Sequence, residues 1–162
     1  YLHRVLDGGP LLLPEGADAP ARHVYVGAVS RAVAGLLGND ATFGEAYNLC
    51  QDDVLPVASL IPMLVSLAGG RNELVPVRDE DLAAHGLERS KVSPFSTRWM
   101  SCLDPTAAKL ELDFRHEPLE SYLPPLVAAY FDEGAPPPEG YEKRGAEREL
   151  ARRARGAFSR RT

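Results

Sequence analysis

Apolar residues recur along much of the chain at intervals of three or four positions, the spacing of one face of a helix. In residues 56–68 they share one such face, and Gly69-Gly70 ends the stretch because glycine adopts positive φ freely. Asp104 followed by Pro105 is typical of a helix start, with a capping carboxylate and a proline at the first helical position. The spacing predicts helices over residues 29–37, 56–68, 79–85, 104–112, 120–130 and 142–158.

Two of these predicted helices contain prolines, each of which removes a backbone donor from the helix. Pro62 predicts that the helix over residues 56–68 either starts near this proline or bends there. Pro124 and Pro125 predict that the helix over residues 120–130 starts later than its apolar pattern.

Short runs rich in β-branched and aromatic residues separate the helices and predict strands. In residues 23–26 ring-bearing side chains alternate with valines, as in a strand. Residues 43–50 form a turn that leads into a second strand-like run. Residues 74–77 predict another strand, and residues 11–13 a short extended run. The alternation of strands and helices indicates the α/β fold class. Because the strands are few and short, we expect the end of one sheet plus a smaller lobe.

Composition divides the chain into a body, residues 1–133, and a tail, residues 134–162, which begins with a proline-rich linker. The net charge of −5 hides an asymmetry, because residues 143–162 hold eight Lys or Arg and two Glu. The acidic remainder would repel nucleic acid. For the tail we favour a solvated or frayed helix over binding of polyanions, because Phe158 is the single aromatic residue among its arginines.

The 162 residues have the apolar content, 44%, and charged content, 25%, of an ordinary soluble globular protein. Cys50 and Cys102 are not spaced as metal ligands, so we interpret them as buried apolar residues in a reducing compartment, the cytoplasm. No apolar run approaches the roughly 20 residues that would span a bilayer. The chain starts with Tyr1 and not with Met, so we expect upstream sequence to be missing.

Residues that could carry chemistry are scattered along the chain. No two of the four histidines stand four positions apart, so no metal site is expected, and no G-x-S-x-G nucleophile motif occurs. The acidic groups at residues 52–53 and 79–81 each precede a predicted helix, and we interpret them as caps. The candidate substrate-binding residues are Arg4, Arg22 and Arg98, because a guanidinium offers paired donors to phosphate or carboxylate groups.

Four sequence motifs follow one another in a specific order. Residues 24–32 are similar to the pattern V-x-V-x-D-V-A-x-A, and residues 44–49 to G-x-x-Y-N-[IL]. Residues 56–70 resemble a helix that ends in glycine, and residues 103–114 a helix that opens with D-x-S-K-A. Over residues 1–131 the chain therefore resembles the extended short-chain dehydrogenases, the NAD-dependent epimerase/dehydratase family.

Several positions depart from this family pattern. Ala28 stands where the family has Asp. The two arginines that hold the diphosphate of a sugar nucleotide would fall at Ala21 and Pro94, so Arg22 and Arg98 are out of register. The chain contains neither the G-x-x-G-x-x-G loop that binds the cofactor pyrophosphate nor the catalytic Y-x-x-x-K pair.

The resemblance implies the end of a Rossmann-type sheet plus the small mixed substrate-side lobe, with the N-terminal cofactor half as the missing partner. It implies an NAD(P)-dependent oxidoreductase or isomerase in which this chain covers a small-molecule substrate, in this family often a sugar nucleotide. By itself the chain would bind neither NAD nor NADP and supply no catalytic residue, and we expect it to form a homo-oligomer. The alternative is a non-catalytic relative that binds RNA or protein partners as a regulatory module.

Overall fold

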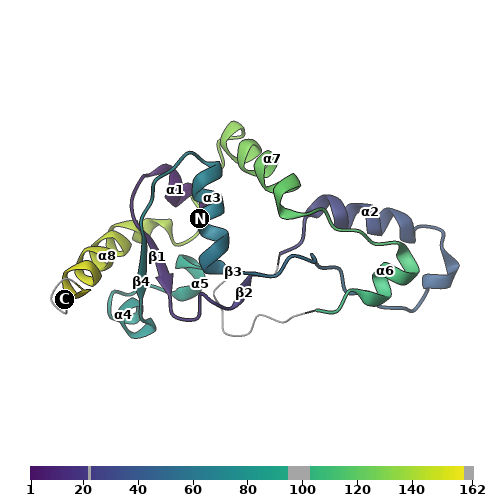
Figure 1. The fold of residues 1–162 in the computed structure, drawn as a ribbon, viewed down its shortest axis with the longest axis horizontal. Coiled ribbons are helices and arrows are strands. Elements are labelled where there is room, and N and C mark those ends of the chain that lie inside the picture. The colour runs from purple at the N-terminus through teal and green to yellow at the C-terminus, as the bar shows by residue number, and fades with distance from the viewer. Residues whose placement is uncertain (22, 95–102, 159–162) are drawn as a thin grey trace.

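Helices and short strands form a mixed α/β arrangement, which confirms the expected α/β class (Figure 1). The computed structural model describes residues 1–21, 23–94 and 103–158, and residues 157 and 158 by their backbone alone. The helices are α1 (Leu2–Leu6), α2 (Val26–Leu36), α3 (Val57–Leu67), α4 (Asp79–Ala84), α5 (Arg89–Val92), α6 (Thr106–Leu112), α7 (Leu119–Asp132) and α8 (Arg144–Phe158). The strands are β1 (Leu11–Pro14), β2 (Pro20–Ala21), β3 (Leu55–Pro56) and β4 (Leu74–Val77), and the 3-10 turns are η1 (Asp40–Thr42) and η2 (Tyr141–Lys143).

The strands β1 and β4 form a parallel pair with Leu11 opposite Leu74. Their side chains alternate between two cores, as expected for a sheet covered on both faces. Leu11 belongs to a core built from α1, α3 and α7, whereas Leu12 and Val75 belong to a second core under α8. Residues 74–77 are thus the strand that the sequence predicts. A second, minimal pair joins β2 to β3 in antiparallel order, with Pro20 opposite Pro56.

The helix α8 closes the second face of the sheet, contrary to the expectation of a solvated or frayed helix. Ala146, Leu150 and Ala154 repeat every four positions and form a narrow apolar stripe that packs against the sheet. Leu150 is 3% exposed and Ala151 is fully buried. Small apolar residues at this spacing therefore suffice to dock a helix whose other faces are strongly charged.

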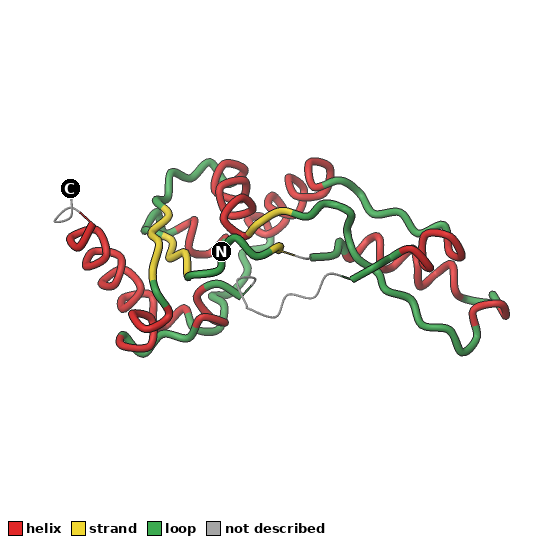
Figure 2. Tube along the Cα trace, turned by 60° about the horizontal axis from the view of Figure 1, so that its bottom comes forward, coloured by secondary structure: helices red, strands yellow, loops and turns green. Residues whose placement is uncertain are grey.

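The helices α2 and α6 lie on an arm, formed by residues 23–54 and 103–118, that extends away from the lobe containing β1 and β4 (Figures 1 and 2). The core of this arm is small and consists of Ala28, Ala32, Ala108 and Phe114. Large apolar side chains remain on its surface, and Leu37 is 79% exposed. The arm therefore buries much less of its apolar surface than the sheet lobe does.

The strands predicted over residues 23–26 and 43–50 are not present, and α2 already begins at Val26. A strand needs a neighbouring strand for its backbone hydrogen bonds, and no described strand pairs with either segment. Some backbone N–H groups of these segments donate to side chains instead. The N–H of His23 donates to Oε1 of Gln51 at 3.0 Å, and the N–H of Tyr25 donates to Nε2 of His116 at 2.8 Å.

The helix α7 begins at Leu119 and continues through Pro124 and Pro125, so the prediction of a later start is wrong. Both prolines are exposed, as are Glu120 and Ser121, whose carbonyls would otherwise accept their missing hydrogen bonds. Carbonyls on an exposed helix face can be hydrated, which makes the interruption tolerable. The helix α3 likewise contains Pro62 on its exposed side.

Candidate functional site

A groove with a volume of about 900 Å³ lies at the carboxyl ends of β1 and β4. Residues from β1, the turn after it, β4, α4 and α8 line this groove. In open α/β sheets ligands bind outside the carboxyl ends of the strands, so both size and position make this groove the candidate site.

The turn after β1 gives the groove a fixed wall. The N–H of Glu15 donates to the carbonyl of Val77 at 3.1 Å, which ties the turn to the end of β4. Gly16 adopts a φ of 80°, and the N–H of Ala17 donates to the carbonyl of Pro14 at 3.2 Å. Ala17 is buried, so the turn presents an apolar floor while Glu15 and Asp18 remain exposed at the rim.

The two arginines that line the groove are held by carboxylates of neighbouring residues. Arg78 donates to both carboxylate oxygens of Asp81, at 2.9 and 3.0 Å, and also pairs with Glu80. This hydrogen bonding lowers the pKa of Asp81 and raises the pKa of Arg78. On α8, Arg153 donates to Glu149 at 2.9 Å and thereby lowers the pKa of that carboxyl. Within the described residues Glu15 and Asp18 have no hydrogen bond or ion pair through their carboxylates.

His85 adds an imidazole to the wall of the groove, directly after α4. Its Nδ1 lies 2.8 Å from the carbonyl of Asp81, and because a carbonyl only accepts, Nδ1 carries the proton in the neutral ring. Its Nε2 is then an acceptor, and this atom is buried without a partner among the described residues. The groove wall thus contains an unused acceptor beneath its surface.

Of the three predicted substrate-binding arginines, the structure describes Arg4 alone; Arg22 and Arg98 lie outside the described residues. Arg4 is 4% exposed and donates through Nε and Nη2 to both carboxylate oxygens of Glu147, at 2.8 and 2.6 Å. Its Nη2 also donates to the carbonyl of Lys91 at 3.2 Å. These contacts give Arg4 a structural role, because a partnered guanidinium at this burial offers a substrate little.

The Arg4–Glu147 pair belongs to a larger ionic network between α1 and α8. Arg144 donates through Nη1 to Glu147 at 2.8 Å and forms two hydrogen bonds to the carboxylate of Asp7, at 2.6 and 2.9 Å. Burial alone would raise the pKa of Asp7, but the hydrogen bonds that it accepts, foremost from Arg144, hold it well below its ordinary value. The network therefore contributes to stability rather than to a reactive centre.

A second polar centre lies where the arm meets the sheet lobe. The ring of Tyr122 contacts His23, His116 and Tyr25, and it stacks on Tyr25 at 5.2 Å. Burial lowers the pKa of His23 and raises that of Tyr122. Nε2 of His23 and the hydroxyl of Tyr122 are buried and have no partner in the described part of the chain. Neither residue lines any of the three cavities described in this section, so we do not place the site here.

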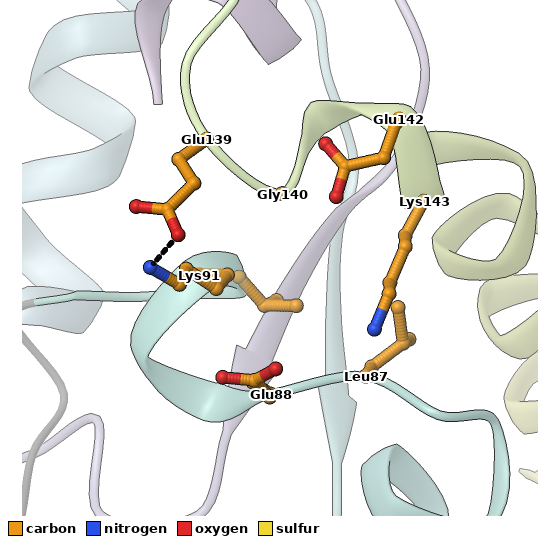
Figure 3. A pocket seen from close by; sticks show the side chains of 8 residues that line it. Leu87, Glu88, Lys91, Glu139, Gly140, Glu142 and Lys143 are labelled. Carbon is orange, nitrogen blue, oxygen red and sulfur yellow. Dashed lines mark ion pairs between the residues drawn. The ribbon is translucent and has the colours of Figure 1, made fainter.

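A small pocket of about 70 Å³ between α5 and η2 is shown in Figure 3. Lys91 pairs with Glu139 across it, and Nζ of Lys143 donates to the carbonyl of Gly86 at 2.7 Å. Another pocket, of about 210 Å³, lies between α2 and α6. There Arg31 pairs with Glu117 and Arg115 pairs with Asp113, so the charges of this second pocket are satisfied within the protein.

Metal and membrane sites find no support in residues 1–21, 23–94 and 103–158. These residues contain no group of three or more His, Cys, Asp or Glu that could hold a metal ion. None of their helices is both long and apolar enough to cross a membrane. Cys50 is buried, as expected, whereas Cys102 lies outside the described residues.

Sequence reasoning missed the residues of the groove. Residues 79–81, interpreted as a helix cap, instead form the first turn of α4, whose N-cap is Arg78 without a side-chain capping hydrogen bond. Residues 15–18 form the turn after β1. The signal that could have found the site is the position of both segments directly after a strand. Comparison with models of known protein families and with curated proteins finds no match for this chain.

Proposed function

We propose that this chain is the substrate-side region of an NAD(P)-dependent oxidoreductase of the epimerase/dehydratase type, and that it is not catalytic by itself. The observation that carries the proposal is the groove at the carboxyl ends of β1 and β4, which has the size of a small-molecule site. The order of the four sequence motifs supports the same family. The fold supports the α/β class, and the assignment to this family rests on the motifs.

The exposed apolar surface of the arm also supports the proposal. Val26 is 72% exposed, Phe43 is 70% exposed and Leu110 is 80% exposed, so the arm presents apolar residues that a soluble protein normally covers. In the proposed protein the cofactor half packs here. It also supplies the partners with which residues 23–26 and 44–49 complete a Rossmann-type sheet.

The surroundings of Gly27 support placing the dinucleotide on the other half. A pyrophosphate loop needs glycines whose open side faces the phosphates at a helix start. Gly27 lies in the first turn of α2, but a Cβ there would come within 2.5 Å of the ring of Tyr25, so this side is already occupied. In the proposal NAD or NADP is held by the other half, and this chain binds and orients the substrate. Arg22 and Arg98 remain candidates for that contact.

Calorimetric titration of the purified chain with NAD and with NADP tests this assignment. We expect no binding of either dinucleotide, whereas the protein that also contains the cofactor half should bind one of them. A micromolar Kd for the chain alone would sink the proposal. The coding sequence before Tyr1 gives an independent test, because it should encode the G-x-x-G-x-x-G loop and the Y-x-x-x-K pair.

The alternative, a non-catalytic module that binds RNA or protein, receives less support. The missing diphosphate arginines and the Arg-rich tail fit this alternative, but in the tail Arg152 and Arg153 pair with Glu149, and Arg155 pairs with Glu73. Guanidiniums that are already paired offer less attraction to phosphate. Loss of the upstream glycine loop and of the Tyr–Lys pair would favour this alternative. The proposal places the protein in the cytoplasm, a reducing compartment that suits the buried thiol of Cys50.

A further inference from the structure

We propose that the groove at the carboxyl ends of β1 and β4 binds a small molecule that joins a protonated amine to an apolar body. The inference takes from the proposed function that this groove is the substrate site, and it adds the chemical class of the substrate. It follows from which charged groups of the groove are already paired and which are not.

The positive charges of the groove are neutralised within the protein. Arg78 is bound by Asp81 and Glu80, and Arg153 is bound by Glu149. A phosphate or carboxylate ligand would have to replace these carboxylates, which lie two to four residues away in sequence. The groove is therefore poorly suited to an anion. The absence of arginines at the family's diphosphate positions, Ala21 and Pro94, is consistent with this conclusion.

The negative charges of the groove are only partly neutralised. Three carboxylates, from Glu15, Asp18 and Asp81, line it, and those of Glu15 and Asp18 make no hydrogen bond or ion pair with the described residues. Both belong to the turn after β1, which the hydrogen bond from Glu15 N–H to Val77 fixes in place. Two unpaired carboxylates on one short turn attract a cation that can donate several hydrogen bonds, and an ammonium group does this.

The floor of the groove requires an apolar partner. Leu13, Pro76 and Ala154 contribute partly or fully exposed apolar side chains from β1, β4 and α8, above the buried Ala17, Val77 and Leu150. A bare ammonium or metal ion would leave this surface wet, whereas an aromatic or aliphatic body would cover it. Apolar floor and acidic rim together specify an amine with a hydrophobic group.

Three probes that share an indole ring test the charge preference. Tryptamine carries an ammonium group, tryptophol a hydroxyl group, and indole-3-propionate a carboxylate. We expect tryptamine to bind the purified chain at least about fivefold more tightly than tryptophol, and indole-3-propionate to bind most weakly. Amide shifts in NMR spectra should cluster at residues 13–18 and 76–81. Added salt should weaken the binding of tryptamine more than the binding of tryptophol.

Matched variants test the residues. The double variant Glu15→Gln and Asp18→Asn should reduce the affinity for tryptamine about fivefold and leave the affinity for tryptophol unchanged. The control variant Asp132→Asn and Glu133→Gln removes two exposed carboxylates at the end of α7 and should change neither affinity. Urea unfolding of both variants should match that of the parent chain, which excludes loss of folding as the cause.

Several outcomes overturn the inference: no binding of tryptamine, equal affinity for tryptamine and tryptophol, preference for indole-3-propionate, or an undiminished affinity in the groove variant. None of these probes is a dinucleotide, so this experiment and the NAD(P) titration can fail separately. If amines bind and the protein with its cofactor half does not bind NAD or NADP, the groove assignment stands and the oxidoreductase assignment falls.

Discussion

Glu147 is 1% exposed and bonded to two guanidiniums, those of Arg4 and Arg144. We predict that Glu147→Gln lowers the free energy of unfolding by about 3–5 kcal/mol, because two buried cations would lose their shared counter-charge. Urea denaturation monitored by circular dichroism measures this loss. The neighbouring Glu149→Gln is the matched control. The arginine partners of Glu149 are exposed, so the urea midpoint of this variant should barely change. Equal effects of the two variants would contradict the assigned role of Glu147.

His23 predicts a specific dependence of stability on pH. Burial lowers the pKa of His23 in the folded chain, so below the ordinary histidine pKa of about 6.5 the unfolded chain binds more protons than the folded chain. The stability that neutral His23 contributes is therefore fully present above this pH and is lost as the pH falls below it. Burial also lowers the pKa of the Tyr1 amine, to about 6, so the slope that belongs to His23 is read below that pH. Urea midpoints should decline as the pH falls from about 6 to 5, and His23→Gln should flatten this slope.

Asp7 provides the comparison, because its depressed pKa acts in a lower pH window. The contribution of Asp7 to the free energy of unfolding is present above the ordinary aspartate pKa of about 3.9. It is lost as the pH falls toward the lower pKa that Asp7 has in the folded chain. Asp7→Asn should therefore leave the slope between about pH 6 and pH 5 intact. If this variant removes that slope and His23→Gln does not, the assignment to His23 is wrong.

At the scale of elements, α8 covers one face of the sheet and does so with few side chains. Leu150→Ala should lower the free energy of unfolding by about 2–4 kcal/mol, because Leu150 is 3% exposed within the core under α8. The control Leu110→Ala changes the same residue type on α6, where Leu110 is 80% exposed, and should cost less than about 0.5 kcal/mol. Similar losses in both variants, measured by urea unfolding, would mean that α8 is not docked.

Most of the helices were predictable from the sequence, whereas two predicted strands are absent from the described structure. The apolar spacing of α3 and the strand at residues 74–77 agree with the structure because their partners lie within the chain. Residues 23–26 and 43–50 have strand-like patterns, but a strand forms only beside another strand, and periodicity does not reveal whether a neighbour exists. The short helices α1 and α5 and the two-residue strands β2 and β3 were not predicted.

The candidate site was less predictable than the fold. Single arginines were chosen for their chemistry, yet Arg4 proved to be the partner of Glu147, 143 positions away in the sequence. Glu15 and Asp18 were not among the candidate residues, and their importance depends on α4 and α8 forming the opposite wall. Which charges are paired is a property of the tertiary structure, and the sequence does not state it.

At the scale of the molecule, the exposed arm predicts self-association. Leu37 on the α2 side and Leu110 on α6 are each about four-fifths exposed, and apolar surface of this kind recruits partners. Light scattering of the isolated chain at several concentrations should show a dimer or larger species. The double variant Leu37→Asp and Leu110→Asp should shift the population toward monomer. A concentration-independent monomer of the parent chain would count against the prediction.

The ionic contact between α1 and α8 has a consequence for protein synthesis. Arg4 leaves the ribosome among the first residues of this segment, while Glu147 follows 143 positions later. At about 5–20 residues per second, the face of the sheet that includes Leu12 waits roughly 7–30 seconds for its cover. During that time the nascent chain exposes an apolar surface, which makes it a client for chaperones that act at the tunnel exit.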